Sequence, residues 1–262
     1  MVLLRNIRKF VAQFSKDSPA SLAPSRTRLV MDPAEWPVIY AIGDVHGCYE
    51  ELVGAEQRIS EDLRDGRALV VLLGDYVDRG ARSCDVLEHL CQPSPPNINR
   101  IALCGNHDDF FLRFLNNELS TEAWLRFAGY QTLTSYGVDP AHILRVGDTM
   151  ALREAVDQAV PASHRILLGK LPSMLQIGNL VFVHAGIRSG LPLEHQSDED
   201  LMWIREPFLT RGPELPIIVV HGHSPQVRPH LGNGRIGIDT GCYATGRLTV
   251  VRIGNRAAKI LS

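Results

Sequence analysis

Five short polar clusters combine aspartate, asparagine or histidine with glycine, and they are spread through the 262-residue chain. Their side chains offer the hard oxygen and imidazole nitrogen atoms that Mn, Fe or Zn ions bind. A phosphoester is negatively charged and repels nucleophiles, whereas two ions held close together neutralise it and hold a bridging hydroxide. The clusters are 43–47 (GDVHG), 74–80 (GDYVDRG), 105–108 (GNHD), 184–186 (HAG) and 221–223 (HGH).

The elements that must position these clusters follow from the apolar pattern. Short apolar runs predict strands at 38–42, 68–73 and 100–104, each ending at a polar cluster. Helical patterns follow them, and the βαβαβ order predicts a parallel sheet with the clusters at the carboxyl ends of its strands, where α/β sheets bind ligands. Further helices are expected at 48–63, 83–91 and 108–115, and further strands at 173–177, 180–184, 217–220, 235–238 and 248–253.

Each cluster taken alone has a structural explanation. A single Gly-Asp is usually a turn, and one histidine at a strand end is more often a hydrogen-bonded part of the scaffold than a ligand. Five clusters in order, each at a strand end, are far more specific. Together they predict a metal site.

The clusters resemble those of the phosphoprotein phosphatase family within the metallophosphoesterase superfamily. That family's pattern is GDxHG, GDxxDRG, GNHE, a later His-Gly or His-Ala pair, and a Gly-His near the end. The similarity covers 38–253 and is greatest to small bacterial and phage serine/threonine phosphatases, which the runs 202–206 (MWIRE) and 238–241 (IDTG) also fit. The resemblance implies an α/β fold, a β-sandwich of mixed sheets built from βαβαβ units, flanked by helices and carrying a helical insertion.

The resemblance also implies roles for individual residues. His107 would protonate the leaving oxygen, and Asp78 would orient His107. Two divalent metal ions (Mn, Fe or Zn) would share Asp75, and the full ligand set would be Asp44, His46, Asp75, Asn106, His184 and His223. The phosphate oxygens would be held by Arg79, Arg205 and Asn106.

Three positions leave alternatives open. Asp108 stands where the family has glutamate, and symmetrical diadenosine tetraphosphate hydrolases also tend to show GNHD and HAG, although they tend to lack the aspartate found here as Asp78. His221 lies two residues before His223, so on a strand it could face the metals, or it could be a core histidine behind them. Asp239 could lie near the metals or bond its own turn.

The expected function is a serine/threonine protein phosphatase in which a metal-bridging hydroxide attacks the phosphate directly. The alternatives are a symmetrical dinucleoside polyphosphate hydrolase, a small-molecule phosphomonoesterase and, from another class, a non-catalytic phosphate-binding adaptor. His107 argues against the adaptor, because binding alone needs no leaving-group acid. The expected partner is a phosphorylated protein or a small phosphoester. The expected helical insertion, at 116–172, contains few basic residues, which favours a monoester over a polyphosphate.

Composition and the N-terminal segment bound the remaining questions. The formal net charge of -2 gives no basic field for nucleic acid, and no apolar run approaches the roughly 20 residues that span a bilayer. The odd number of cysteines, 5 without a CxxC pair, predicts reduced thiols and a cytoplasmic protein. The oligomeric state is not indicated.

Two segments are expected along the chain, a leader at 1–36 and a catalytic domain at 37–262. Apolar residues at helical spacing within 1–14, with basic residues between them, predict an amphipathic helix. Such a helix could associate weakly with a membrane surface or a partner, or it could pack on its own domain.

Overall fold

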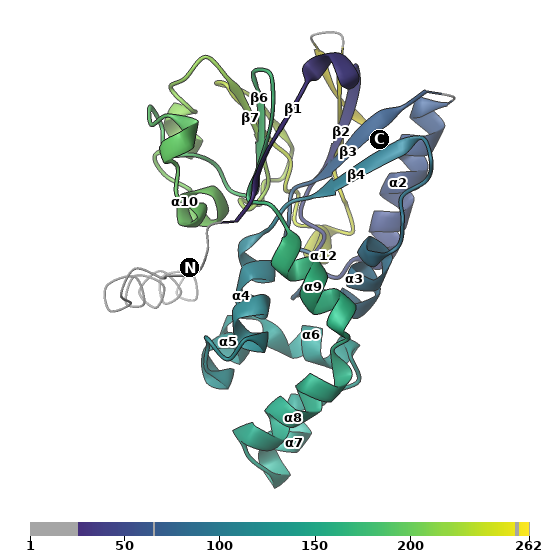
Figure 1. Cartoon of the computed structure of the whole chain (residues 1–262), viewed down its shortest axis with the longest axis vertical. Coiled ribbons are helices and arrows are strands. Elements are labelled where there is room, and N and C mark those ends of the chain that lie inside the picture. Colours follow the sequence, from purple (N-terminus) through teal and green to yellow (C-terminus); the bar gives the residue numbers. More distant parts are fainter. Residues whose placement is uncertain (1–25, 65, 255–256, 262) are drawn as a thin grey trace.

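The computed structural model describes residues 26–64, 66–254 and 257–261, and two mixed β-sheets form its centre (Figure 1). Within this described part, one sheet has the strand order β1-β5-β6-β7-β9-β8 and the other β11-β10-β2-β3-β4. The strands are β1 (Arg28–Met31), β2 (Val38–Ile42), β3 (Ala68–Leu72), β4 (Ile98–Ala102), β5 (Met174–Ile177), β6 (Leu180–Val183), β7 (Ile218–His221), β8 (His230–Gly232), β9 (Arg235–Gly237), β10 (Val250–Gly254) and β11 (Ala257–Leu261).

Strands β2, β3 and β4 run parallel, and their side chains alternate between two cores. In β2, Ile39 and Ala41 pack between the sheets, whereas Tyr40 and Ile42 face the helices on the other side. Strand β3 alternates in the same way, with Leu69 turned toward the second sheet. A strand buried on both faces reads as a continuous apolar run, as β2 and β3 do in the sequence.

Helices cover the outer faces of both sheets. Along α2, the buried residues Leu52, Ala55 and Ile59 recur at helical spacing and pack against the five-stranded sheet. Leu201 and Phe208 bury the outer face of the six-stranded sheet. The helices outside the insertion are α2 (Tyr49–Leu63), α3 (Ser83–Cys91), α4 (Asn106–Leu115), α10 (Asp198–Trp203), α11 (Phe208–Arg211) and α12 (Cys242–Thr245), and the short 3-10 helices are η1 (Pro33–Glu35) and η2 (Leu193–His195).

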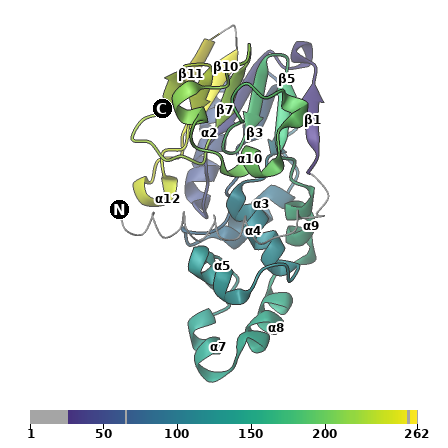
Figure 2. The same cartoon turned by 90° about the vertical axis from the view of Figure 1, so that its left-hand side faces the viewer.

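The expected helical insertion is confirmed, and its helices extend away from the sheets (Figure 2). Helix α9 packs on α3 and α4, and α6 packs on α3, so the near half of the insertion joins the core. Helices α7 and α8 pack on each other at the far end (Figure 2). The insertion comprises α5 (Thr121–Phe127), α6 (Gly129–Ser135), α7 (Pro140–Val146), α8 (Thr149–Ala159) and α9 (Ala162–Lys170).

The expected fold class is confirmed, while the expected leader is wrong in one respect. Strand β1 falls inside residues 1–36, yet it pairs in parallel with β5, with Arg28 opposite Met174. The segment assigned to the leader therefore contributes a strand to the six-stranded sheet. The amphipathic helix expected at 1–14 lies outside the described residues.

In the part of the chain that the structure describes, no helix is both long and apolar enough to cross a bilayer.

Arg26 joins β1 to the helices and provides a test of this packing. Its guanidinium contacts Asp109 Oδ1 at 2.7 Å and donates to the carbonyls of Leu168 and Leu171. Arg26→Ala leaves these mostly buried acceptors unpaired, so we expect a loss of about 1–3 kcal/mol in the free energy of unfolding. At about 2–4 °C per kcal/mol, calorimetry will detect the fall in Tm.

The matched control is Arg188→Ala, because Arg188 pairs with Asp200 at 2.9 Å while its side chain is 61% exposed. An exposed pair contributes about 0–1 kcal/mol. Equal Tm shifts in the two variants would show that the Arg26 contacts do not hold β1.

Candidate metal centre and active site

The carboxyl ends of five strands bring the predicted ligands together. Strands β2, β3 and β4 end just before the loops of Asp44, Asp75 and Asn106, while β6 precedes His184 and β7 precedes the His223 turn. All the predicted metal ligands are buried: Asp44, His46, Asp75, Asn106, His184 and His223. The positioning expected from the sheet order is therefore observed.

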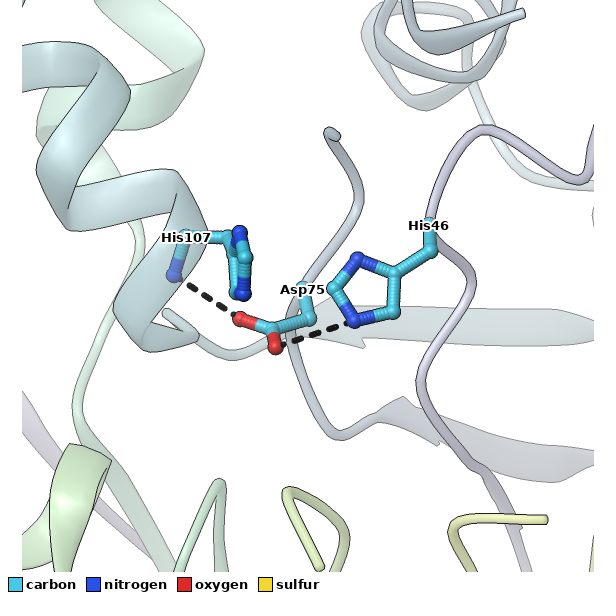
Figure 3. Close-up of side chains that lie close together, drawn as sticks. All are labelled: His46, Asp75 and His107. Atoms are coloured by element: carbon cyan, nitrogen blue, oxygen red, sulfur yellow. Dashed lines mark hydrogen bonds and ion pairs between the residues drawn. The ribbon is translucent and has the colours of Figure 1, made fainter. Parts of the chain in front are cut away.

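Asp75 lies at the middle of the cluster. Its Oδ2 is 3.3 Å from His46 Nε2, and its Oδ1 is 3.4 Å from His184 Nε2. Oδ1 also accepts a hydrogen bond of 3.0 Å from the backbone N–H of His107 (Figure 3). One carboxylate thus faces histidines on two sides, as a residue that bridges two ions would.

A second group of donors meets around Asn106. Its Oδ1 lies 2.9 Å from both His184 Nε2 and His223 Nδ1. The backbone N–H of His223 donates to Asp44 at 3.1 Å. His184 contacts both Asp75 and Asn106, so the donors around these two residues adjoin. His223 Nε2 is buried without a partner among the described residues.

The histidine tautomers suit metal binding. His46 Nδ1 lies 2.8 Å from the carbonyl of Val77, and His184 Nδ1 lies 2.9 Å from that of Leu73. A carbonyl only accepts, so each Nδ1 must donate, and each Nε2 is directed at Asp75. Backbone carbonyls commonly orient ligand histidines in this way.

The charges of the buried cluster favour the binding of cations. Burial lowers the pKa of His46 to about 3, so a neutral imidazole presents its Nε2 lone pair to the Asp75 carboxylate. Burial also lowers the pKa of His184, but Asp75 and Asp44 outweigh it and raise that pKa to about 9. Burial and the neighbouring Asp239 raise the pKa of Asp44. The Asp75 carboxylate and the neutral His46 Nε2 are both acceptors and face each other in a buried site. Divalent cations satisfy such an arrangement, so the residues present fit the two expected ions.

His107 belongs to a separate hydrogen-bonded chain beside the ligands. Its Nδ1 donates to Asp78 Oδ2 at 2.7 Å, and the Thr132 hydroxyl donates to the other Asp78 oxygen at 2.6 Å. Asp78 is fully buried. The pairing of His107 with Asp78 matches the expectation from the sequence, and Thr132 adds a second anchor from α6.

The two predicted arginines lie at the rim. Arg79 Nη2 donates to His107 Nε2 at 3.2 Å, and its Nη1 donates to the Tyr243 hydroxyl at 2.8 Å. Arg205 Nη1 donates to the Ser224 hydroxyl at 2.9 Å. Both side chains are exposed, which leaves room to turn toward an anion.

A model of the calcineurin-like phosphoesterase family matches residues 37–251. The chain belongs to this family. Among curated relatives, the asymmetrical bis(5′-nucleosyl)-tetraphosphatase PrpE of Bacillus velezensis is 25% identical over 234 residues, covering 80% of this chain and 87% of the relative. The PrpE protein of Halalkalibacterium halodurans is 28% identical over 235 residues, covering 80% and 88%.

Solved structures share the calcineurin-like fold. A protein described as a candidate diadenosine tetraphosphatase superimposes with a TM-score of 0.62 at 20% identity, covering 89% of this chain and 97% of the other. At that identity the likeness concerns the fold alone. It agrees with the two mixed sheets and flanking helices.

Several site residues of this calcineurin-like phosphoesterase adopt left-handed backbone. Non-glycine residues rarely do so, and such strain gathers at functional sites that the surrounding structure holds in place. The φ values are 45° at His46, 55° at Asp75, 71° at Asp78, 69° at Arg79 and 63° at His223.

The contacts of Asp108, His221 and Asp239 bear on the roles that the sequence left open. Asp108 accepts three backbone N–H bonds, from Asp75, Tyr76 and Gly105, at 2.8, 2.8 and 2.9 Å. Burial and the Asp75 carboxylate raise its pKa to about 7. Asp108 therefore ties the second and third loops together.

His221 turns away from the ligands. Its Nδ1 donates to the Gly222 carbonyl at 3.0 Å, and its Nε2 accepts from Arg235 at 3.3 Å. This geometry is that of a core histidine. Asp239 accepts a hydrogen bond of 2.9 Å from Gly241 N, so it bonds its own turn. Its carboxylate also raises the pKa of the predicted ligand Asp44.

Sequence reasoning missed three residues that contact the site: Thr132, Ser224 and Tyr243. A lone threonine in a helix, a serine after a turn and a tyrosine in a short helix carry no recognisable pattern. The packing of α6 and α12 against the loops reveals Thr132 and Tyr243, and the hydrogen bond from Arg205 reveals Ser224.

Gly222 tests how tightly the centre is built. A Cβ atom at this position would lie 1.9 Å from Asp44 Oδ1. Gly222→Ala must therefore displace Asp44 or the His223 turn, and we expect at least about a 10²-fold loss of phosphoesterase activity, because displacements of about 1 Å cost that much. We also expect reduced metal content by elemental analysis.

The control is Gly169→Ala in α9, where an added Cβ meets nothing within 4 Å. It should keep activity and metal. If Gly222→Ala behaves like this control, the close approach of Gly222 to Asp44 is not needed for activity or metal binding.

Proposed function

We propose that this calcineurin-like phosphoesterase hydrolyses bis(5′-nucleosyl) tetraphosphates asymmetrically, to a nucleoside monophosphate and a nucleoside triphosphate. The observation that carries the proposal is the match to PrpE proteins of that activity across 80% of the chain. This differs from the order that the motifs suggested, with a serine/threonine phosphatase first and a symmetrical tetraphosphate hydrolase as an alternative.

The cations that contact the site lie outside the insertion. The guanidinium groups of Arg153 and Arg165 donate hydrogen bonds to the carbonyls of Phe114 and Leu115, respectively, and to neighbouring side chains. They stabilise the insertion itself. The cations available to a polyphosphate at the site are Arg79 and Arg205, whose planar donors match phosphate oxygens.

The proposed roles follow the geometry of the loops. Two divalent ions, when bound, would supply a bridging hydroxide and neutralise the phosphate. Asp44, His46, Asp75, Asn106, His184 and His223 would hold them. When a phosphate oxygen takes over the Nη2 donor of Arg79, His107 Nε2 becomes free to carry a proton for the leaving oxygen, while Asp78 holds the ring through Nδ1.

A serine/threonine protein phosphatase remains the second candidate, and one observation favours it. A serine alkoxide is a poor leaving group that needs a proton, whereas a nucleotide leaves more readily. The buried Thr132–Asp78–His107 chain is well built to deliver that proton.

Parallel kinetics test the proposal directly. With Mn²⁺ supplied, we expect diadenosine tetraphosphate to be cleaved to ATP and AMP, with kcat/KM at least about tenfold above that for a phosphoserine peptide, a difference worth about 1.4 kcal/mol. Chromatography identifies the products. Two molecules of ADP, or preference for the peptide, would reject the proposal.

The role of His107 gives a prediction that depends on the leaving group. His107→Asn should slow phosphoserine hydrolysis by about 10²–10⁴-fold, the usual value of general acid catalysis. It should slow p-nitrophenyl phosphate hydrolysis much less, because nitrophenolate leaves without a proton. Asp78→Asn should show the same dependence more weakly, and the two effects should not add.

Metal content should stay unchanged in both variants, and exposed His142 provides the matched control, His142→Asn. Equal slowing of both substrates with loss of metal would make His107 part of the metal site instead.

A further inference from the structure

Tyr243 is an exposed aromatic residue at the edge of the metal centre. It lies in α12, directly after the turn of Asp239 and Gly241, and its side chain is 41% exposed. The other aromatic residue with comparable exposure in the described chain is Tyr130 at 43%, in the insertion. Position therefore distinguishes Tyr243, since an exposed tyrosine as such is ordinary.

Two site residues hold the Tyr243 ring in place. The Arg79 guanidinium lies 4.7 Å from the ring centroid and also donates to the hydroxyl. The His46 imidazole meets the ring edge-on, with centroids 5.4 Å apart. The ring is thus backed by a cation on one side and adjoins a predicted metal ligand.

Next to His107, three aromatic rings pack on one another. Phe127 stacks on His107 with centroids 4.4 Å apart, and Phe110 and Trp203 pack against Phe127. These three side chains are half-buried. Among these aromatic residues around the site, Tyr243 is the most exposed.

We infer that the Tyr243 ring, backed by Arg79, is the stacking platform for the nucleobase of the nucleotide whose phosphate is attacked. This inference rests on the proposed function. Any nucleobase has a π face that stacks on an aromatic side chain, and a ring held by arginine loses little freedom when the base binds.

The position of the platform also bears on which phosphate is cleaved. Tyr243 adjoins the predicted metal ligand His46, so a base stacked on this ring lies within reach of the centre. A nucleoside carries its α-phosphate directly, and this phosphate then reaches the centre first. Attack by water at that phosphorus breaks its bond to the next bridging oxygen and releases a monophosphate and a triphosphate.

Tyr243 could instead act only through its hydroxyl, by holding Arg79. Two variants separate these roles. Tyr243→Phe keeps the ring and removes the acceptor of the Arg79 bond, whereas Tyr243→Leu removes both. Tyr130→Leu is the matched control, because it deletes a tyrosine of similar exposure in α6 of the insertion.

The experiment compares diadenosine tetraphosphate with bis(5′-ribosyl) tetraphosphate, which has the same sugars and phosphates without bases. We expect Tyr243→Leu to raise KM for the adenosine compound at least about tenfold, as expected for one lost base stack. The change for the base-free compound should be much smaller. Tyr243→Phe should change both substrates by the same factor, and Tyr130→Leu neither.

The outcomes distinguish this inference from the proposed function. If the unmodified protein does not cleave diadenosine tetraphosphate, the proposed function and the platform fall together. If it does, and Tyr243→Leu affects both substrates equally or Tyr243→Phe matches Tyr243→Leu on the adenosine compound, the platform alone is wrong.

A measurement on the unmodified protein covers the case in which Tyr243→Leu does not fold. Stacking predicts that KM rises from diadenosine to diuridine to bis-ribosyl tetraphosphate, as the stacking surface shrinks. Equal KM values across this series would overturn the inference.

Discussion

The centre depends on one buried carboxylate outside the predicted ligand set. Asp108, at the start of α4, accepts the backbone N–H groups of Gly105, Asp75 and Tyr76. These bonds hold together two loops that follow neighbouring strands, and they keep Asp75 in a left-handed conformation that its side chain disfavours. Because Asp75 faces both His46 and His184, a shift in this loop would disturb both halves of the centre.

Close packing makes the loops hold one another. An atom added to Gly105 would meet Asp75 at 2.2 Å, and one added to Gly222 would meet Asp44 at 1.9 Å. The glycines therefore permit carboxylates and histidines to crowd together without intervening side chains. Such crowding is costly in a buried site unless cations bind there, which makes folding of the site and metal binding two parts of one process.

The helical insertion contributes to the chemistry as well as to the shape. Thr132 of α6 donates to Asp78, and Phe127 of α5 stacks on His107. The insertion thus holds the expected acid through two contacts, while α12 presents the exposed Tyr243 next to His46 and Arg79.

The sequence by itself determined the elements that are governed by local pattern and the residue types that bind metals. The strand at 38–42 and the helix at 83–91 agree with β2 and α3, because alternation and helical periodicity are local properties. Tertiary structure alone decided what depends on distant partners. Strand β1 was missed because its pairing partner, β5, is far along the chain, and Tyr243 and Thr132 gain their meaning only where α12 and α6 pack on the loops. Strand alternation would have placed His221 beside His223, but β7 ends at His221 and the positive φ of His223 turns the chain, so the two rings diverge.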